Sequence, residues 1–183
     1  KKESEKDSYS FLSSHYHEGE FSSYIPIMNG CNNFCSYCIV PYVRGREVSR
    51  DVESIVEEVK FLDSKGVKEI TLLGQNVNSY HSEYQGKEVG FPELLEIITP
   101  YMKNILWVRF ESPHPKDFSS RLISVIRDNP KVAKHIHLPM QSGSSRILKL
   151  MNRHTTREAF IELWDRMRSE IKDLTFSTDV IVG

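Results

Sequence analysis

The feature that most constrains the fold is the alternation of short apolar runs with segments of helical periodicity. Strands are predicted at residues 24–28, 68–73, 105–110, 135–138 and 175–182. Strands that alternate with helices at this spacing usually pair in parallel through right-handed crossovers. We therefore expect an α/β fold, a partial (β/α) TIM-like barrel with about five parallel strands.

Helical segments fill the intervals between these strands. From Asp51 onward the apolar side chains recur at helical spacing, and Gly66 is expected to end this helix. A long polar loop with Gly86 and Gly90 should follow the second strand. Three more helices are predicted, around Leu94–Ile98, Leu122–Ile126 and Phe160–Met167, the last of them preceded by a Thr155–Glu158 capping box.

Polar and unusual residues follow the predicted strands. They are the cysteine loop after the first strand, Gly74, Gln75 and Asn76 after the second, Glu111 and His114 after the third, and Gln141 after the fourth. Asp179 lies within the fifth strand, where an unpaired carboxylate would be costly. Because the catalytic residues of such barrels lie at the carboxyl ends of the strands, we expect these side chains to gather at one face.

The sequence contains only three cysteines, Cys31, Cys35 and Cys38. A disulfide would leave one thiol over and would strain such short spans. Zinc would need a histidine as fourth ligand, and His15, His17 and His81 do not stand at a usual spacing for one. An iron–sulfur cluster held by three thiolates explains both the spacing and the missing fourth ligand, since one iron then stays open for a cofactor.

Composition limits the class of protein. The 183 residues suffice for one domain with a sizeable core, and 39% are hydrophobic. No apolar run reaches the length of a membrane span, and no signal segment opens the chain, so we expect a cytoplasmic protein without a membrane contact. The net charge of −1 gives no global nucleic-acid footprint.

Although the net charge is close to zero, positively charged residues gather in two segments of the sequence. Arg44, Arg46 and Arg50 follow the cysteine loop, and a second group gathers near residues 149–157. Either group can meet a phosphate or a carboxylate, and either can equally be a solvated surface.

The ends of the chain suggest a fragment of a longer protein. Residues 1–23 are polar and are expected to be a linker from a missing N-terminal domain. Residues 24–183 are expected to form the core, truncated at its C-terminus because the sequence stops within the fifth predicted strand.

The spacing Cys-x-x-x-Cys-x-aromatic-Cys, with Tyr37 as the aromatic residue, resembles the cluster-binding loop of radical S-adenosylmethionine (SAM) enzymes. Five further runs are similar to the methylthiotransferase family of that superfamily: Tyr24–Cys31, Ile39–Arg50, Leu72–Tyr80, Ser112–Pro115 and His137–Ser144. The similarity is greatest to the branch that methylthiolates isopentenyladenosine next to the anticodon of tRNA. Branches that act on threonylcarbamoyladenosine or on a ribosomal protein are the alternatives.

The resemblance implies a set of cofactors and partners. A [4Fe–4S] cluster would bind the amino and carboxylate groups of SAM at its open iron, and electron transfer would yield a 5′-deoxyadenosyl radical. A second [4Fe–4S] cluster is expected on the missing N-terminal domain, with tRNA as substrate and an electron donor of reductase or flavodoxin type. The enzyme is expected to be a monomer. A zinc-stabilised nucleic-acid binding module without catalysis is the competing function.

The resemblance also assigns roles to individual residues. Cys31, Cys35 and Cys38 are the expected cluster ligands, and Asp179 the expected catalytic residue, which orients cofactor or adenine. Expected contacts of SAM are Phe34, Tyr37, Gly74, Gln75, Asn76, Glu111, Gln141 and Arg153, and expected contacts of tRNA are Tyr42, Arg44 and Arg46.

Simpler roles remain open for several of these residues. Phe34 can be a core residue, Gly74–Asn76 a plain turn, and Glu111 or Gln141 a helix cap. Arg153 can form a surface ion pair, and Asp179 can satisfy buried amides. His137, inside the fourth strand, is expected to be a hydrogen-bonded core histidine.

Overall fold

The computed structural model describes Phe11 and residues 16–182. Strands β1 (Ser22–Pro26), β4 (Glu69–Leu73) and β7 (Trp107–Phe110) form a parallel sheet in the order β1-β4-β7. Strands β8 (His135–His137) and β9 (Thr175–Ser177) form a second parallel pair. A parallel bridge between Val108 and Val132 links β7 to the segment before β8. The predicted α/β fold with parallel strands is therefore confirmed.

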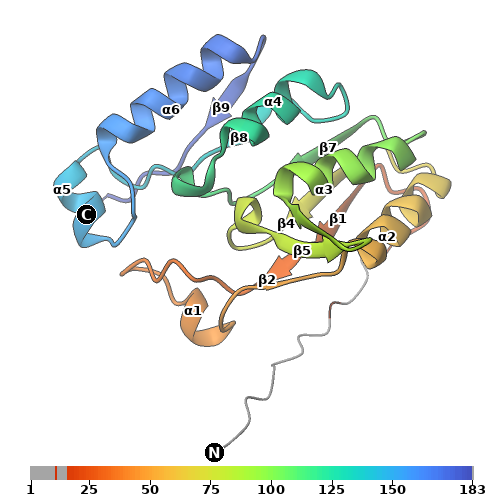
Figure 1. Cartoon of the computed structure of the whole chain (residues 1–183), viewed down its shortest axis with the longest axis horizontal. Helices are drawn as coiled ribbons and strands as arrows, with labels where there is room; N and C mark the ends of the chain where they lie inside the picture. The colour runs from red at the N-terminus through yellow and green to blue at the C-terminus, as the bar shows by residue number, and fades with distance from the viewer. Residues whose placement is uncertain (1–10, 12–15, 183) are drawn as a thin grey trace, which may run out of the picture.

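Helices pack against these strands (Figure 1). They are α2 (Val52–Ser64), α3 (Phe91–Ile98), α4 (Ser120–Asp128) and α6 (Arg157–Glu170). Successive helices contact one another in chain order, as in an open section of a (β/α) barrel. The core lies between the strands and helices and includes Ile25, Ile55, Leu62, Ile70, Leu72, Leu94, Leu95, Ile98, Val108, Leu122 and Ile126. Among the described residues no helix is long and apolar enough to cross a membrane.

Short elements occupy the connections between these strands and helices. They are β2 (Met28–Asn29), α1 (Val40–Val43), β3 (Val48–Ser49), η1 (Val77–Ser79), β5 (His81–Tyr84), β6 (Lys87–Gly90), η2 (Thr99–Tyr101), η3 (Pro115–Asp117) and α5 (Ser145–Leu150). Strands β2 and β3 pair antiparallel and close the cysteine loop at its base.

Helix α2 has the ends that its sequence predicts. The Asp51 carboxylate accepts a hydrogen bond from the Ser54 amide (2.7 Å), which caps the first turn. Gly66 adopts a φ of 81°, and the Val67 amide donates to the Leu62 carbonyl (3.2 Å). Glycine adopts this left-handed conformation without a steric penalty, so the helix ends where expected.

The polar loop expected after the second strand is in fact a β-hairpin. Strands β5 and β6 pair antiparallel, and Tyr84 faces Lys87 across the turn. Gln85 and Gly86, with φ values of 52° and 74°, have the sign pattern of a type I′ turn. The prediction was wrong because the hairpin is mostly polar and lacks the apolar alternation that marks a half-buried strand.

Three features near the C-terminus differ from expectation: the start of α6, the presence of α5 and the end of β9. Thr156, not Thr155, caps α6 by accepting from the Ala159 amide (3.1 Å), and Glu158 instead accepts from the Ser145 hydroxyl (2.8 Å). Helix α5, capped by Ser144, was not predicted because it is only six residues long. Strand β9 ends at Ser177 rather than Val182.

The first strand begins slightly earlier than predicted. Strand β1 begins at Ser22, two residues before the expected start of the core at residue 24. Residues 1–10 and 12–15 of the expected linker lie outside the described part of the chain.

Arg50 has a structural position rather than a phosphate-binding one. Its side chain and that of Glu58 are each 4% exposed and form an ion pair. The Arg50 guanidinium also donates to the Ser54 hydroxyl (2.9 Å) and to the Pro26 carbonyl (3.3 Å). The Tyr80 hydroxyl donates to the Arg50 carbonyl (2.6 Å). Arg50 therefore ties the end of β1 to α2 and to the strand that returns from the cysteine loop.

Replacing Glu58 with alanine should destabilise the fold by about 3–5 kcal/mol, because the Arg50 guanidinium would stay buried without its counter-charge. The free energy of unfolding from urea titrations measures this loss. Glu57→Ala is the matched control, since Glu57 is exposed on the same helix and its loss should change stability by less than about 0.5 kcal/mol. Equal effects of the two substitutions would contradict this role of the ion pair.

Candidate functional site

The cysteine loop connects β2 to α1 and carries all three thiols. Cys31 and Cys35 are buried, Cys38 is half-buried, and all three are free. Gly30, at the start of the loop, has a φ of 77°, and a Cβ there would overlap the Arg46 carbonyl oxygen. Only glycine fits where the two sides of the loop approach so closely.

Hydrogen bonds hold the loop from two sides. The Cys31 amide donates to the Gly45 carbonyl (3.2 Å), and the Ser36 amide donates to the Met151 carbonyl beyond α5 (3.0 Å). The Asn152 side chain donates to the Asn33 and Phe34 carbonyls, both at 3.1 Å. A segment more than a hundred residues away in the sequence therefore fixes the conformation of the loop.

Burial and the neighbouring charges oppose ionisation of Cys31. Burial raises the pKa of Cys31, and the charges of Glu47, Cys35 and Cys38 raise it further. The pKa of Tyr37 rises to about 12, mainly through burial, although the Arg153 charge lowers it. Thiolates crowded in this way need a positive group to balance them, either bound metal or a nearby cation.

Arg153 is a buried cation that contacts Cys35. One guanidinium nitrogen, Nη1, lies 3.7 Å from Cys35 Sγ, and Nη2 donates to the Pro139 carbonyl (2.8 Å). The residue is 7% exposed, so the expectation of a surface ion pair does not hold.

The arrangement of ligands does not support zinc. A structural zinc site needs its ligands to converge on one ion. Within Phe11 and residues 16–182, no group of three or more His, Cys, Asp or Glu side chains could hold a single metal ion. His17 and His81 are exposed, and His15 lies outside the described residues. Thiolates of an iron–sulfur cluster each bind a different iron, so convergence on one point is not required of them.

An aromatic and cationic surface flanks the cysteine loop. The Arg46 guanidinium lies 4.4 Å from the centre of the Phe34 ring, and the Tyr42 ring meets Phe34 edge to face at 5.9 Å. Phe34 itself has a φ of 49°. Tyr42, Arg44 and Arg46 are exposed, as contacts to a large partner require.

The loop after β4 packs tightly against the base of the cysteine loop. A Cβ on Gly74 would overlap Cγ of Met28, which explains the glycine by packing within the protein. Asn76 is 1% exposed, and its side chain donates to the Asp117 carboxylate (2.8 Å). Glu111 follows β7, and its amide donates to the Leu72 carbonyl on β4 (3.1 Å). The Gly74–Asn76 turn and Glu111 therefore share one edge of the sheet.

Gln141 and Asp179 lie together at the corresponding ends of β8 and β9. The Gln141 amide donates to the Asp179 carbonyl (2.8 Å). The Asp179 carboxylate lies 3.2 Å from His137 Nε2 and is 64% exposed. It follows β9 instead of lying inside a strand, so the expected cost of a buried carboxylate does not arise. His137 also contacts the Ser177 hydroxyl through Nδ1 (2.9 Å), so it is hydrogen-bonded as expected, but its side chain is 23% exposed and does not belong to the core.

Four buried polar atoms have no hydrogen-bond partner among the described residues. They are Gln75 Oε1, Asn76 Oδ1, His114 Nε2 and Arg153 Nε. Buried polar groups are rarely left unpaired in proteins. All four belong to the segments that follow β4, β7 and α5, beside the cysteine loop. The sequence did not assign a role to His114, although its position between two prolines in a polar segment could have drawn attention to it.

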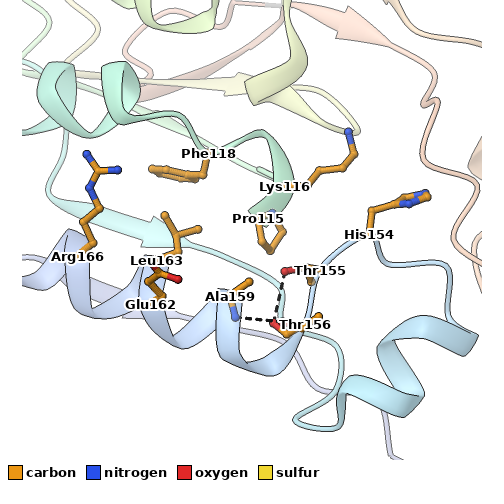
Figure 2. Close-up of a pocket in the computed structure, with 10 residues that line it drawn as sticks. All are labelled: Pro115, Lys116, Phe118, His154, Thr155, Thr156, Ala159, Glu162, Leu163 and Arg166. Atoms are coloured by element: carbon orange, nitrogen blue, oxygen red, sulfur yellow. Dashed lines mark hydrogen bonds between the residues drawn. The ribbon is translucent and has the colours of Figure 1, made fainter.

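A cavity of about 590 Å³ borders the same region without containing the thiols. Figure 2 shows it between the segment around Pro115 and helix α6, with Lys116 and His154 near one end and Arg166 at the other. None of the predicted SAM contacts lines it. We therefore separate this cavity from the candidate site.

Known proteins resemble this chain in sequence. Curated proteins called tRNA-2-methylthio-N(6)-dimethylallyladenosine synthase from Treponema pallidum (strain Nichols) and Phocaeicola vulgatus are 49% and 56% identical to it. The alignments cover 96% and 88% of this chain but only 39% and 35% of these relatives. The chain thus spans less than half of their length.

Solved structures with low sequence identity share the fold. The radical SAM methyltransferase TsrM from Kitasatospora setae superposes with a TM-score of 0.65 at 18% identity, covering 91% of this chain and 31% of that one. The cobalamin-dependent SAM radical enzyme OxsB gives 0.65 at 16% identity, covering 86% and 23%. The sequence model of the Radical SAM superfamily matches residues 25–183. The chain belongs to the Radical SAM superfamily.

Proposed function

We propose that this chain is the radical SAM core of a tRNA methylthiotransferase that converts isopentenyladenosine beside the anticodon to its 2-methylthio form. The observation that carries the proposal is the 49–56% identity to synthases of that name across the segment that holds the cysteine loop. This chain covers only 39% of such a relative, so we propose that other segments contribute to the complete reaction.

The chemistry of the donor set fits a [4Fe–4S] cluster and SAM. Cys31, Cys35 and Cys38 are free thiols in one fixed loop and would hold three irons. When bound, cluster and SAM together supply one-electron cleavage of the sulfonium and thus a radical. The four unpartnered buried atoms beside the loop support a polar ligand there, since two of them are acceptors and two are donors.

The protein's own residues would orient that ligand. Gln75 Oε1 and Asn76 Oδ1 are free to accept from the amino group of SAM, and Arg153 Nε is free to donate to its carboxylate. Glu111 and Gln141, at the carboxyl ends of β7 and β8, would contact the ribose or the methionine part. Gly74 would allow the turn to lie against Met28.

Aromatic and acidic residues complete the proposed site. Phe34 and Tyr37 would exclude water from the cluster and flank the adenine. Asp179, held near His137, would orient cofactor or adenine, and its exposed carboxylate leaves it free to do so.

The tRNA would enter beside the cysteine loop. Tyr42 offers a stacking surface, and Arg44 and Arg46 offer cations for phosphates. A second [4Fe–4S] cluster on an N-terminal segment, an electron donor of reductase or flavodoxin type, a monomeric state and a cytoplasmic location complete the proposal. These four points stay predictions from the resemblance.

The ligand role of the cysteines has a direct test. After anaerobic reconstitution, Cys35→Ala in the full-length protein should retain little iron and sulfide in this domain and lose its visible absorption and its electron paramagnetic resonance signal, because two thiolates cannot hold the cluster. Ser36→Ala, which alters an exposed neighbour, is the control. A fully loaded Cys35→Ala protein would refute the assignment.

The substrate is tested in cells. Deleting the gene should remove 2-methylthio-isopentenyladenosine from hydrolysed tRNA and leave isopentenyladenosine in its place, as measured by mass spectrometry of nucleosides. Loss of a methylthio group from threonylcarbamoyladenosine instead, or from a ribosomal protein, would assign another branch of the family. An unchanged nucleoside profile would overturn the proposed substrate.

The tRNA surface can be tested through salt dependence. Replacing Arg44 and Arg46 together with glutamine should weaken binding of the full-length protein to an anticodon stem-loop severalfold. The slope of log K against log salt should become shallower by about one unit per arginine. Arg121→Gln is the control, since Arg121 is exposed on α4 and paired with Glu96. An unchanged slope would remove these arginines from the interface.

A further inference from the structure

His114 is a buried histidine with one unused hydrogen-bonding nitrogen. The residue is 3% exposed, and its Nε2 has no partner among the described residues. It follows β7 in the Ser112–Pro115 run, which resembles the family but received no role. A buried donor or acceptor without a partner costs about 1–3 kcal/mol, so the observation calls for a group that pairs with it.

The proton on the imidazole can be assigned from its other nitrogen. The Lys116 amide donates to Nδ1 (3.2 Å), so Nδ1 is an acceptor and carries no proton. Burial, together with the charge of Arg153, lowers the pKa of His114 to about 3. The ring is therefore neutral near pH 7, and its single proton is on Nε2. His114 presents a donor at the unpartnered position.

The backbone around His114 holds that donor in place. Pro113 and Pro115 flank the residue and restrict its backbone. The His114 amide donates to Asn78 Oδ1 (2.8 Å), and Asn78 Nδ2 donates back to the His114 carbonyl (2.9 Å). This reciprocal pair fastens the backbone of the segment to the loop after β4, and the bond from the Lys116 amide to Nδ1 orients the ring.

None of the charged groups that act on the ring is available as a hydrogen-bond acceptor for Nε2. Lys116, Arg153 and His154 act on His114 as positive charges. The negative charge of Asp117 also acts on the ring, but its carboxylate already accepts hydrogen bonds from Asn76 (2.8 Å) and from Lys116 (2.7 Å). Arg153, whose charge acts on His114, carries a second buried donor without a partner, Nε. Two buried donors without an acceptor, on residues whose charges interact, fit an anionic oxygen group of a ligand.

Two unpaired acceptors on the loop after β4 further restrict the chemical class of the ligand. Gln75 Oε1 and Asn76 Oδ1 are buried acceptors without a donor. A ligand with both an amino nitrogen and a carboxylate can pair with these acceptors and with the two donors. The amino-acid end of SAM has this combination, and its carboxylate has two oxygens, so an oxygen can accept from protein donors while the other binds elsewhere.

We propose that His114 positions SAM by donating its Nε2 hydrogen to the carboxylate of the methionine moiety, together with Arg153. The inference rests on the proposed function and adds a positioning residue to it. This role also explains why His114 is a neutral donor. A neutral imidazole can orient a carboxylate through a hydrogen bond without adding a second buried cation near Arg153.

Ligand binding to the full-length, cluster-loaded protein tests the inference. His114→Ala should weaken binding of SAM and of S-adenosylhomocysteine about 10- to 100-fold, as expected for one lost bond to a charged group. Binding of 5′-methylthioadenosine, which lacks the amino-acid end, should change less than about twofold. Equilibrium dialysis measures all three affinities, independently of turnover.

Two further variants separate positioning from general structure. His114→Gln keeps an N–H donor and should recover part of the lost affinity for S-adenosylhomocysteine. His81→Ala, a substitution of an exposed histidine on β5, should leave all affinities unchanged. If His114→Ala fails to fold, the same comparison is made with His114→Gln and His114→Leu, of which only the first should retain selectivity for the carboxylate-bearing ligand.

The outcomes distinguish failure of the inference from failure of the proposed function. Equal binding of S-adenosylhomocysteine by wild type and His114→Ala would overturn the inference and leave the proposed function intact. An equal loss for 5′-methylthioadenosine would also overturn it, because His114 would then shape the whole site. A wild-type protein that takes up no cluster and binds no SAM would overturn the proposed function itself.

Discussion

Parallel pairing of β1, β4 and β7 is the constraint on which the rest of the structure depends. The register aligns Pro26 with Leu73 and Leu72 with Phe110, so the segments that leave these strands start at one edge of the sheet. A slip of one residue would turn each strand's core side chains to the opposite face. The same pairing thus maintains the core and brings the segments with the cysteines, Gln75 and His114 to that edge.

This edge is both polar and buried, which is unusual for connecting loops. Hydrogen bonds between side chains and backbone join its segments, as in the Asn78–His114 pair and the contact of Arg153 with Pro139. Four polar atoms nevertheless stay unpaired. Each costs about 1–3 kcal/mol, and a ligand that pairs with them removes that cost on binding. The stability of the edge and its affinity for a polar ligand are therefore linked.

Much of this arrangement could be predicted from sequence, because apolar periodicity and helix ends are local signals. The α2 caps, Asp51 and Gly66, and the parallel strands are examples. The β5–β6 hairpin could not be predicted, because its strands are mostly polar and its turn, Gln85-Gly86, is not a strong hairpin signal. The burial of Arg50 against Glu58 and the contact of Arg153 with Cys35 depend on tertiary packing, so spacing in the sequence does not reveal them.

Charge balance connects the cysteine loop with the segments around it. Burial and neighbouring charges raise the pKa of Cys31, and the Arg153 guanidinium places a positive charge beside Cys35. A second buried cation near Arg153 would destabilise the site, because the two positive charges would repel each other. Burial keeps His114 neutral, so it adds a hydrogen-bond donor without adding charge. One fixed cation with one neutral donor is a combination that can hold a carboxylate firmly while leaving the thiolates balanced.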